Sequence, residues 1–446
     1  MLKKPSNTHQ LGFLMADLGD QLDSAHGLYR LAEQINWSYF DNEFSKHYRS
    51  DFGRPALPIR LMVSLLILKH VRNLSDESVV EQWSENNYFQ FFSGKTTFSP
   101  VRPCDPTELV NFRKRITEEG MEKIFSESIR INGKDGKEKE IIADTTVQEK
   151  NITFPTDSKL HCRIIDKCVR QAEVEQIELR QSYKRTVPRL RYEQRGRNHP
   201  SHFKKARKAD KKIKTIAGRL VRELERNLPA EHYFSKDLSL FKSVLNQKKS
   251  DTNKIYSLHE PHVQCISKGK DHKKYEFGNK VSLLKTKTTG VIVGALSFEK
   301  NIYDGKTLPQ ALDQYEKLTG STVQKVFCDL GYRGPKRIGT TQIITPDAGK
   351  GLIKGSYKKR KHRRDMKTRS AIEPIIGHVK QDHRLGRNFL KGIAGDKINV
   401  LMAAAAFNFK RFIRLKWHAL LELLYNALLR IIAADVKLKT SFSIAD

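Results

Sequence analysis

The chain has 446 residues, enough for two or three domains, and its 82 Lys and Arg against 50 Asp and Glu give a formal net charge of +32. A compact chain with this charge repels itself, which indicates a polyanionic partner and favours nucleic acid over an anionic membrane. A membrane-spanning protein is excluded because no apolar run reaches bilayer length, and the longest candidate, residues 61–68, is flanked by Arg60 and Lys69.

The N-terminal third of the chain is typical of helices. MLKKPSNTHQ is followed by no secretory apolar segment, so we expect a cytosolic protein. Residues 11–131 carry apolar residues at helical spacing, most clearly in 28–35, 59–71 and 78–92, and Ser75 resembles a helix N-cap. Two short helices joined by a turn suit a helix-turn-helix DNA reader, but they suit equally a helical bundle with Trp83 in its core. We predict a helical N-terminal domain, residues 1–135, that binds DNA ends.

An α/β domain is predicted from the next elements. Residues 140–147 form a strand candidate in which the acid Asp144 closes the apolar run EIIAD, and 150–154 are a possible second strand. Later strands are expected at 263–267, 275–284 and 289–298, followed by a helix at 307–318, strands at 323–328 and 341–345, and a helix at 367–384. Strands first and then alternating helix and strand predict a layered α/β domain over 136–156 and 250–392.

A basic helical insertion, residues 157–249, separates the first strand from the others. Between residues 181 and 226 there are sixteen Lys or Arg and four acids. Such a run is usually a solvated face, but an excess this large favours a surface that follows phosphates, and Lys204, Lys205, Arg207 and Lys208 are candidates for it. Residues 393–446 are expected to form C-terminal helices and are a candidate oligomer contact.

Two acids stand where predicted strands end. Asp144 closes one apolar strand, and Asp329 closes another, VFCD, with Gly331 allowing a sharp turn. Each alone is commonly a turn former or helix cap. Cleavage of a phosphodiester by divalent metals, however, needs carboxylates that converge from different elements, because Mg²⁺ takes oxygen ligands.

A third acid has a spaced context. Three residues separate Arg369 from Glu373 and six separate Glu373 from Lys380, so a helix presents cation, carboxylate and cation on one face. The alternative is an amphipathic helix with a routine ion pair. Pro374 places the acid near a helix start or kink.

These segments resemble bacterial insertion-sequence DDE transposases of the insertion-sequence four and five superfamily, closest to the five-type family. The Arg-Glu-Lys spacing resembles their signature, IIADTTVQEKNITFPTD their first-aspartate segment, and VFCDLGYRG their second. Residues 54–116 are similar to the helical region that precedes their catalytic domain, and the resemblance covers most of residues 10–412. The family usually carries a Tyr three positions before the Arg, where this chain has Met366.

The resemblance implies an RNase H-like catalytic domain in which Asp144, Asp329 and Glu373 hold two Mg²⁺ (or Mn²⁺) ions. It implies cleavage at the terminal inverted repeats of the element, joining of the 3′-hydroxyl ends to target DNA, and a homodimer in a synaptic complex in the bacterial cytoplasm, at the nucleoid. Cations that would neutralise DNA phosphates near these acids are Arg369, Lys380, Lys358, Lys359, Arg360, Lys361, Arg363 and Arg364. Lys280 could also contact DNA, although a solvated strand lysine is the commoner case.

Three other interpretations remain open. The chain could be an RNase H-fold nuclease that does not rejoin ends, an inactive transposase-derived DNA-binding regulator, or a basic RNA-associated protein. The His-Glu-Pro-His segment at 259–262 resembles a fragment of a zinc motif, but Pro261 opposes the required helix, so we expect a turn. Five scattered cysteines without a CxxC pair predict reduced thiols and no zinc site.

Overall fold

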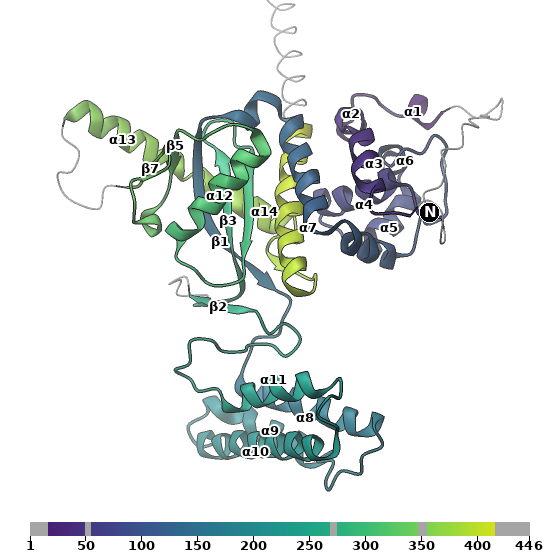
Figure 1. Cartoon of the computed structure of the whole chain (residues 1–446), viewed down its shortest axis with the longest axis vertical. Helices are drawn as coiled ribbons and strands as arrows, with labels where there is room; N and C mark the ends of the chain where they lie inside the picture. The colour runs from purple at the N-terminus through teal and green to yellow at the C-terminus, as the bar shows by residue number, and fades with distance from the viewer. Residues whose placement is uncertain (1–16, 50–54, 268–273, 347–354, 415–446) are drawn as a thin grey trace, which may run out of the picture.

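The computed structural model describes residues 17–49, 55–267, 274–346 and 355–414, arranged as an N-terminal helical bundle, a central sheet with helices, and a separate helical insertion (Figure 1). No helix within these ranges is both long enough and apolar enough to cross a bilayer. The five cysteines are all free, as the sequence predicts. The predicted C-terminal helices are helical through residue 414, and their remainder lies outside the described residues.

The N-terminal bundle has the expected helical content. Its helices are α1 (Leu18–Gln21), α2 (Gly27–Gln34), α3 (Trp37–Ser45), α4 (Ile59–Val71), α5 (Asp76–Glu85), α6 (Asn87–Phe92) and α7 (Pro106–Ile131). Ser75 caps α5 by accepting from the backbone N–H of Ser78, which confirms the predicted cap. Helix α4 is buried almost throughout and Trp83 is fully buried, so these residues form a core.

The exposed face of α5 is acidic. Glu77, Glu81 and Glu85 recur at a spacing of four residues and are all solvent-exposed, so they lie along one side of the helix. A row of carboxylates repels DNA phosphates. The helical-bundle interpretation of this segment therefore fits better than a helix-turn-helix with α5 in the groove.

The central sheet is mixed. Its strands are β1 (Glu140–Lys150), β2 (Gln264–Ser267), β3 (Tyr275–Thr286), β4 (Ile292–Phe298), β5 (Lys325–Phe327), β6 (Arg337–Ile338), β7 (Thr341–Ile344) and β8 (Arg387–Asn388). The order is β2-β3-β1-β5-β7-β6, with β4 paired to β3 and β8 paired to β1. Strands β1, β5 and β7 are parallel, whereas β3 runs antiparallel to β1 and to β4.

The first strand differs from its prediction. We expected a strand over 140–147 and a second strand at 150–154, but β1 is a single strand that runs from Glu140 to Lys150. The reason is tertiary: β1 pairs with β3 over nine consecutive residues, from Ile141 to Glu149, and this ladder stabilises polar positions that local sequence does not favour.

The sheet has two different faces. Ile141 and Ala143 pack into the main core together with α12 (Asp304–Thr319) and with helical residues 392–414. Ile142 points to the opposite face because side chains alternate along a strand, and there it packs with Phe327 and with Ile372 of α14 (Ile372–Asp382). Asp144, two residues after Ile142, shares this second face.

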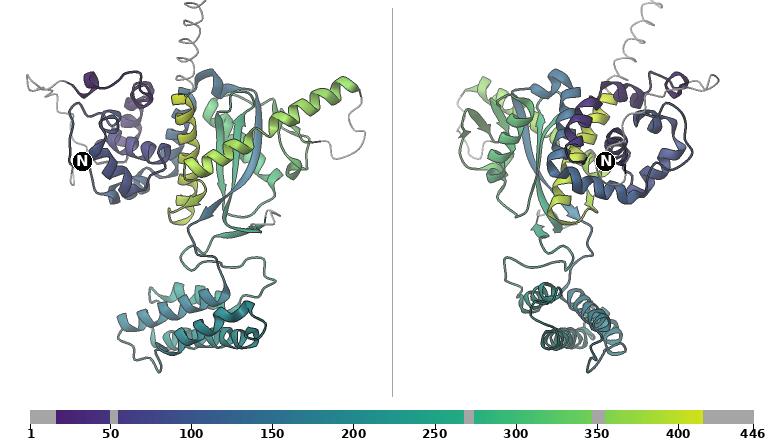
Figure 2. Two further views of the ribbon diagram at one scale, coloured as in Figure 1. Left: turned by 180° about the vertical axis from the view of Figure 1, so that it is seen from behind. Right: turned by 45° about the vertical axis from the view of Figure 1, so that its right-hand side comes forward.

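The insertion has its own hydrophobic core. It comprises α8 (Asp157–Val174), α9 (Thr186–Arg195), α10 (Phe203–Asn227) and α11 (Ser235–Asn246), whose buried apolar residues form a cluster separate from the main core. Figures 1 and 2 show these helices beyond the carboxyl end of β1, at a distance from the N-terminal bundle.

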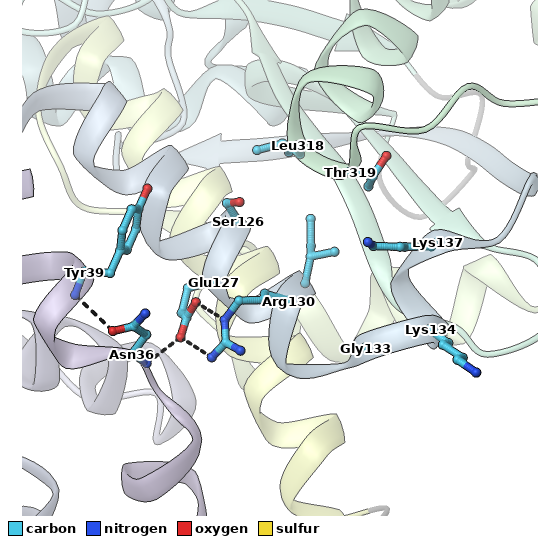
Figure 3. Close-up of a pocket in the computed structure, with 11 residues that line it drawn as sticks. Asn36, Tyr39, Ser126, Glu127, Arg130, Gly133, Lys134, Lys137, Leu318 and Thr319 are labelled. Atoms are coloured by element: carbon cyan, nitrogen blue, oxygen red, sulfur yellow. Dashed lines mark hydrogen bonds and ion pairs between the residues drawn. The ribbon is translucent and has the colours of Figure 1, made fainter.

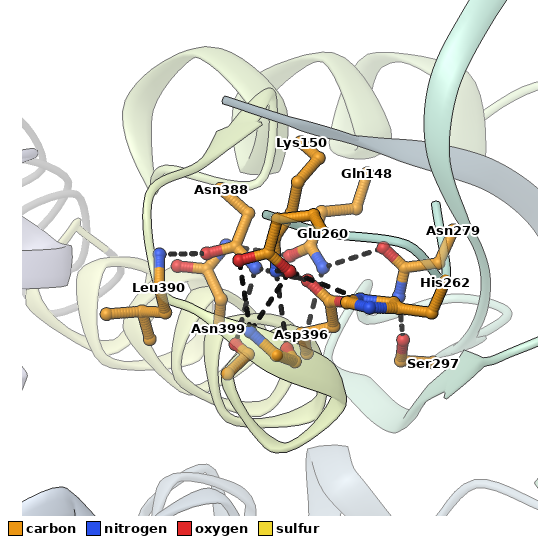
Figure 4. Close-up of polar contacts among 12 residues, drawn as sticks. Gln148, Lys150, Glu260, His262, Asn279, Ser297, Asn388, Leu390, Asp396 and Asn399 are labelled. Atoms are coloured by element: carbon orange, nitrogen blue, oxygen red, sulfur yellow. Dashed lines mark hydrogen bonds and ion pairs between the residues drawn. The ribbon is translucent and has the colours of Figure 1, made fainter. Parts of the chain in front are cut away.

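A buried ionic network closes the base of the insertion (Figure 4). Lys150, at the end of β1, lies 2.6 Å from Asp396 and 3.3 Å from Glu260, and His262 contacts Asp396 at 2.9 Å. The predicted turn at 259–262 therefore contributes two residues that tie the chain returning from the insertion to the sheet and to helical residues 392–414. Removing one partner of such a buried network is expected to be strongly destabilising.

Candidate active site

The parallel register of the sheet brings two of the predicted acids together. Ile142 of β1 pairs with Phe327 of β5, so Asp144 and Asp329 each stand two residues beyond this pair. Neighbouring strands are about 4.8 Å apart, so the two acids lie side by side just beyond the carboxyl end of the paired β1–β5 segment. The long insertion between them does not disturb this arrangement because it leaves and re-enters the chain outside this strand pair.

The turn after β5 fixes the second acid. Asp329 caps the short helix η3 (Leu330–Tyr332) by accepting a hydrogen bond of 2.8 Å from the backbone N–H of Gly331. A Cβ atom at Gly331 would lie 2.9 Å from Oδ1 of Asp329 and 2.8 Å from Oδ2 of Asp304. A larger residue at this position would therefore have to displace one of these two carboxylates.

Two carboxylates and one guanidinium lie near the buried thiol of Cys328. Burial raises the pKa of the Cys328 thiol, the charges of Asp329 and Asp144 raise it further, and the guanidinium of Arg369 acts in the opposite direction. One buried thiol is therefore close to both aspartates and to the arginine of the Arg-Glu-Lys spacing. The Arg369 guanidinium therefore lies near Asp144 and Asp329, and it can offset the negative charge of their carboxylates.

Helix α14 carries the third acid over the same face of the sheet. Ile372 is buried against Ile142 and Phe327, the residues that precede the two aspartates. Glu373 is the next residue, in the first turn of α14, as Pro374 predicted. Its side chain is 64% exposed and pairs with Arg369 at 3.5 Å. The apolar anchor therefore sets Glu373 beside the strand ends.

The three predicted acids do not form a preassembled metal site in the described part of the chain. Among the residues that the structure describes, no group of three or more His, Cys, Asp or Glu side chains is arranged to hold a metal ion. The register brings Asp144 and Asp329 together, whereas the Glu373 side chain is largely exposed to solvent and contacts Arg369.

The helix predicted at 367–384 is in fact two helices. Helix α13 spans Ser356–Arg369 and ends at Ser370, after which α14 begins. The basic run at 358–364 belongs to α13 because Lys and Arg are good helix formers and no Gly or Pro interrupts them. The helix is anchored to the sheet by Asp365, which pairs with Lys287 at 2.9 Å, and by Met366, which packs on the cluster around Ile372.

Sequence reasoning missed one acid beside this site. Asp304, in the first turn of α12, accepts hydrogen bonds from Lys280 at 2.8 Å and from the Thr145 hydroxyl at 2.9 Å. Lys280 also donates to the carbonyl of Ile302 and is only 12% exposed, so its ammonium group is committed within the protein. The DNA contact predicted for Lys280 stays a prediction, and in the structure its ammonium group is paired with Asp304. The only sequence signal for Asp304 was an acid at a helix start, which is ordinary.

Two ranges of the chain match known protein families. Residues 16–115 match a transposase domain (DUF772), and residues 245–409 match the transposase DDE domain. A Rhizobium meliloti protein named "Uncharacterized protein ORF8 in nfe locus" is 42% identical over 193 residues, which are 41% of this chain and 93% of that protein. The chain belongs to the insertion-sequence DDE transposases. No solved structure matches it.

The DDE domain match includes two of the three predicted acids of this transposase. Asp329 and Glu373 fall inside the DDE domain match, whereas Asp144 precedes it. The placement of Asp144 in the site therefore depends on the β1–β5 register.

Basic surfaces of the transposase lie on two helices. On α13, Lys359, Arg360, Arg363 and Arg364 are exposed, while the side chains of Lys358 and Lys361 lie outside the described residues. On α10, Lys204, Lys205, Arg207 and Lys208 are exposed. Lys380 is half-buried in the last turn of α14.

The transposase also has a cavity far from the acids (Figure 3). It lies between the N-terminal bundle and the carboxyl end of α12, where Glu127 binds Arg130 and the backbone N–H of Asn36, and it reaches Thr319. Thr319 is the last residue of α12 and Asp304 is the first, so about 22 Å of helix separates the cavity from the acids. The cavity is therefore not part of the candidate active site.

Proposed function

We propose that this transposase binds the ends of its insertion sequence, cleaves their phosphodiester backbone and joins the 3′-hydroxyl ends to target DNA. The proposal is carried by one observation, the side-by-side emergence of Asp144 and Asp329 from adjacent parallel strands. Acids at this position can bind cations in a place that a DNA backbone can reach, since both residues are only partly buried.

The fold proposed for the catalytic domain is RNase H-like. The strand order β4-β3-β1-β5-β7, with the first three strands antiparallel and the last two parallel to β1, supports this assignment. Helices α12 and α14 contribute to different faces of the sheet, which is the layered arrangement that the sequence predicts.

The donor set fits hard divalent cations. Asp144, Asp329 and Glu373 offer only carboxylate oxygens, which Mg²⁺ and Mn²⁺ prefer. Two such ions held there would supply activation of a water and stabilisation of the leaving 3′-oxygen. Glu373 is held by one long contact to Arg369 and is exposed, so its side chain can turn toward the aspartates without loss of packing.

Basic residues near the acids would bind and neutralise the DNA phosphates. Arg369 is positioned between Glu373 and the strand ends, where its guanidinium can bind a phosphate oxygen in a directed way. Exposed cations of α13 extend outward from the same place, and Lys380 stands at the far end of α14. Together they would neutralise the crowded phosphates of a DNA end and its target.

The insertion would hold the flanking duplex. Along α10, Lys204, Lys208, Lys211, Arg219, Arg222 and Arg226 are exposed at spacings of three, four, seven or eight residues, so they form one stripe, which we call the α10 stripe. The stripe spans 22 residues or about 33 Å, close to one turn of duplex DNA. A homodimer would present two such stripes in a synaptic complex.

The test uses DNA that carries the sequences flanking the gene, including any short inverted repeats. We expect Mg²⁺-dependent nicking at the repeat ends, and joining of precut ends to a target plasmid. Asp144→Asn and Asp329→Asn should abolish both steps, whereas Asp313→Asn, an exposed acid on α12, should change neither. Cleavage without joining of precut ends would favour a nuclease, and binding without cleavage by the unaltered protein would favour a regulator.

A further inference from the structure

Asp304 approaches the two aspartates from the other face of the sheet. Thr145 follows Asp144 directly, so its side chain points to the face opposite that of Asp144, where α12 begins. There the Thr145 hydroxyl donates to Oδ1 of Asp304 at 2.9 Å, and the backbone N–H of the same Thr145 donates to Oδ1 of Asp144 at 2.7 Å. A single residue of β1 therefore links the two carboxyl groups.

The second oxygen of Asp304 reaches the turn that holds Asp329. Oδ2 of Asp304 and Oδ1 of Asp329 lie 2.8 and 2.9 Å from the same point, the Cβ position of Gly331, so these oxygens are at most 5.7 Å apart. Carboxylates this close repel each other unless cations are near. The ammonium group of Lys280, 2.8 Å from Asp304, supplies one positive charge to these carboxylates.

A buried hydroxyl lies against the same group of acids. Tyr332 is 2% exposed. Burial and the charges of Cys328, Asp144 and Asp304 raise its pKa well above the usual value, while a hydrogen bond with Thr307 acts in the opposite direction. The Tyr332 hydroxyl therefore lies close to both Asp144 and Asp304.

We propose that Asp304, oriented by Lys280 and Thr145, is a positioning residue that fixes the separation of Asp144 and Asp329 for cation binding. Through Thr145 it holds the strand that carries Asp144, and through the Gly331 turn it limits where Asp329 can move. Lys280 serves the site from within by orienting Asp304. The role resembles that of outer carboxylates in metal sites, which orient the groups that bind the ion. This inference rests on the proposed function, because it takes Asp144 and Asp329 as the cation ligands.

The test measures cation binding without turnover. Mn²⁺ is titrated into the full-length protein without DNA and followed by electron paramagnetic resonance, which counts free Mn²⁺. We expect Asp304→Asn and Thr145→Val to weaken Mn²⁺ binding about tenfold or more. Asp313→Asn, in the same helix but exposed, is the matched control and should bind as the unaltered protein does. Thermal unfolding checks each variant, and Thr145→Val retains side-chain size if Asp304→Asn fails to fold.

The outcomes separate this inference from the proposed function. If Asp144→Asn and Asp329→Asn lose Mn²⁺ while Asp304→Asn and Thr145→Val bind it like Asp313→Asn, Asp304 has no positioning role and the inference is overturned. If Asp144→Asn and Asp329→Asn bind Mn²⁺ as well as the unaltered protein, the proposed metal site itself is wrong. Weaker binding in both Asp304→Asn and Thr145→Val, with unfolding temperatures unchanged, supports the inference.

Discussion

Removing charge from the α10 stripe should lower both the affinity for DNA and its dependence on salt. The variant Lys204→Gln, Lys208→Gln, Lys211→Gln removes three exposed cations that form no ion pair with any described residue. Each phosphate contact contributes about 0.9 to the slope of log affinity against log salt, so the slope should fall by about 2.7. If all three lysines contact phosphates and the two proteins bind equally at 1 M salt, that difference corresponds to an affinity roughly 500-fold lower at 0.1 M salt.

The assay is fluorescence anisotropy with full-length protein and a labelled duplex of about three helical turns, at 50 to 200 mM salt. The control variant Lys95→Gln, Lys134→Gln, Lys300→Gln removes the same net charge from exposed positions outside the insertion. Equal slopes for the two variants would show that the stripe has no special role and that only net charge matters.

Three further changes test the site and the bundle beside it. Gly331→Ala should displace Asp304 or Asp329, because its Cβ would lie 2.8 and 2.9 Å from their oxygens; cleavage should fall at least tenfold with an unchanged unfolding temperature, and undiminished cleavage would contradict the crowding argument. Ile372→Ala should cost about 2–5 kcal/mol of local packing and loosen Glu373, which limited proteolysis of α14 alongside cleavage rates would detect, with Val379→Ala as a second buried position on the same helix. Asp76→Asn should destabilise the bundle by about 3–5 kcal/mol, because Lys69 and Arg113 remain buried without their counter-charge. Burial opposes ionisation of Asp76, but Arg113 and Lys69 outweigh it and lower its pKa to about 2, so the stability it contributes is present above pH 4 and is lost as the pH falls toward 2. Urea unfolding at pH 6 and pH 2.5 should therefore show a smaller difference between Asp76→Asn and the unaltered protein at the lower pH, and an equal difference would refute the pKa shift.

Helix signals in this chain are local and were predictable. The cap at Ser75, the helix start close to Pro374 and the helical insertion all follow from short-range pattern. The carboxyl end of β1 was not, because residues 148–150 are polar and are held in the strand by pairing with β3 and β8. The break at Ser370 between α13 and α14 was missed in the single helix expected at 367–384, although Pro374 indicated a helix start or kink close by.

The candidate site shows the same division. Glu373 could be found by its spacing from Arg369 and Lys380, and Asp329 by its glycine turn. Asp304 could not, because an Asp in the first turn of a helix is common and its significance comes from Thr145, Lys280 and Gly331, which are distant in sequence. The internal partner of Lys280 was hidden for the same reason, since a strand lysine gives no sign of a carboxylate 24 positions later.

The central claim is that Asp144 and Asp329 bind the same catalytic cations. It is tested most directly by exchanging each for cysteine, because a thiolate ligand favours softer metals over Mg²⁺. Asp144→Cys and Asp329→Cys should lose cleavage of transposon ends in Mg²⁺ and regain part of it in Mn²⁺, while Asp313→Cys should behave like the unaltered protein in both metals. Full Mg²⁺-dependent cleavage by either active-site variant would contradict the account.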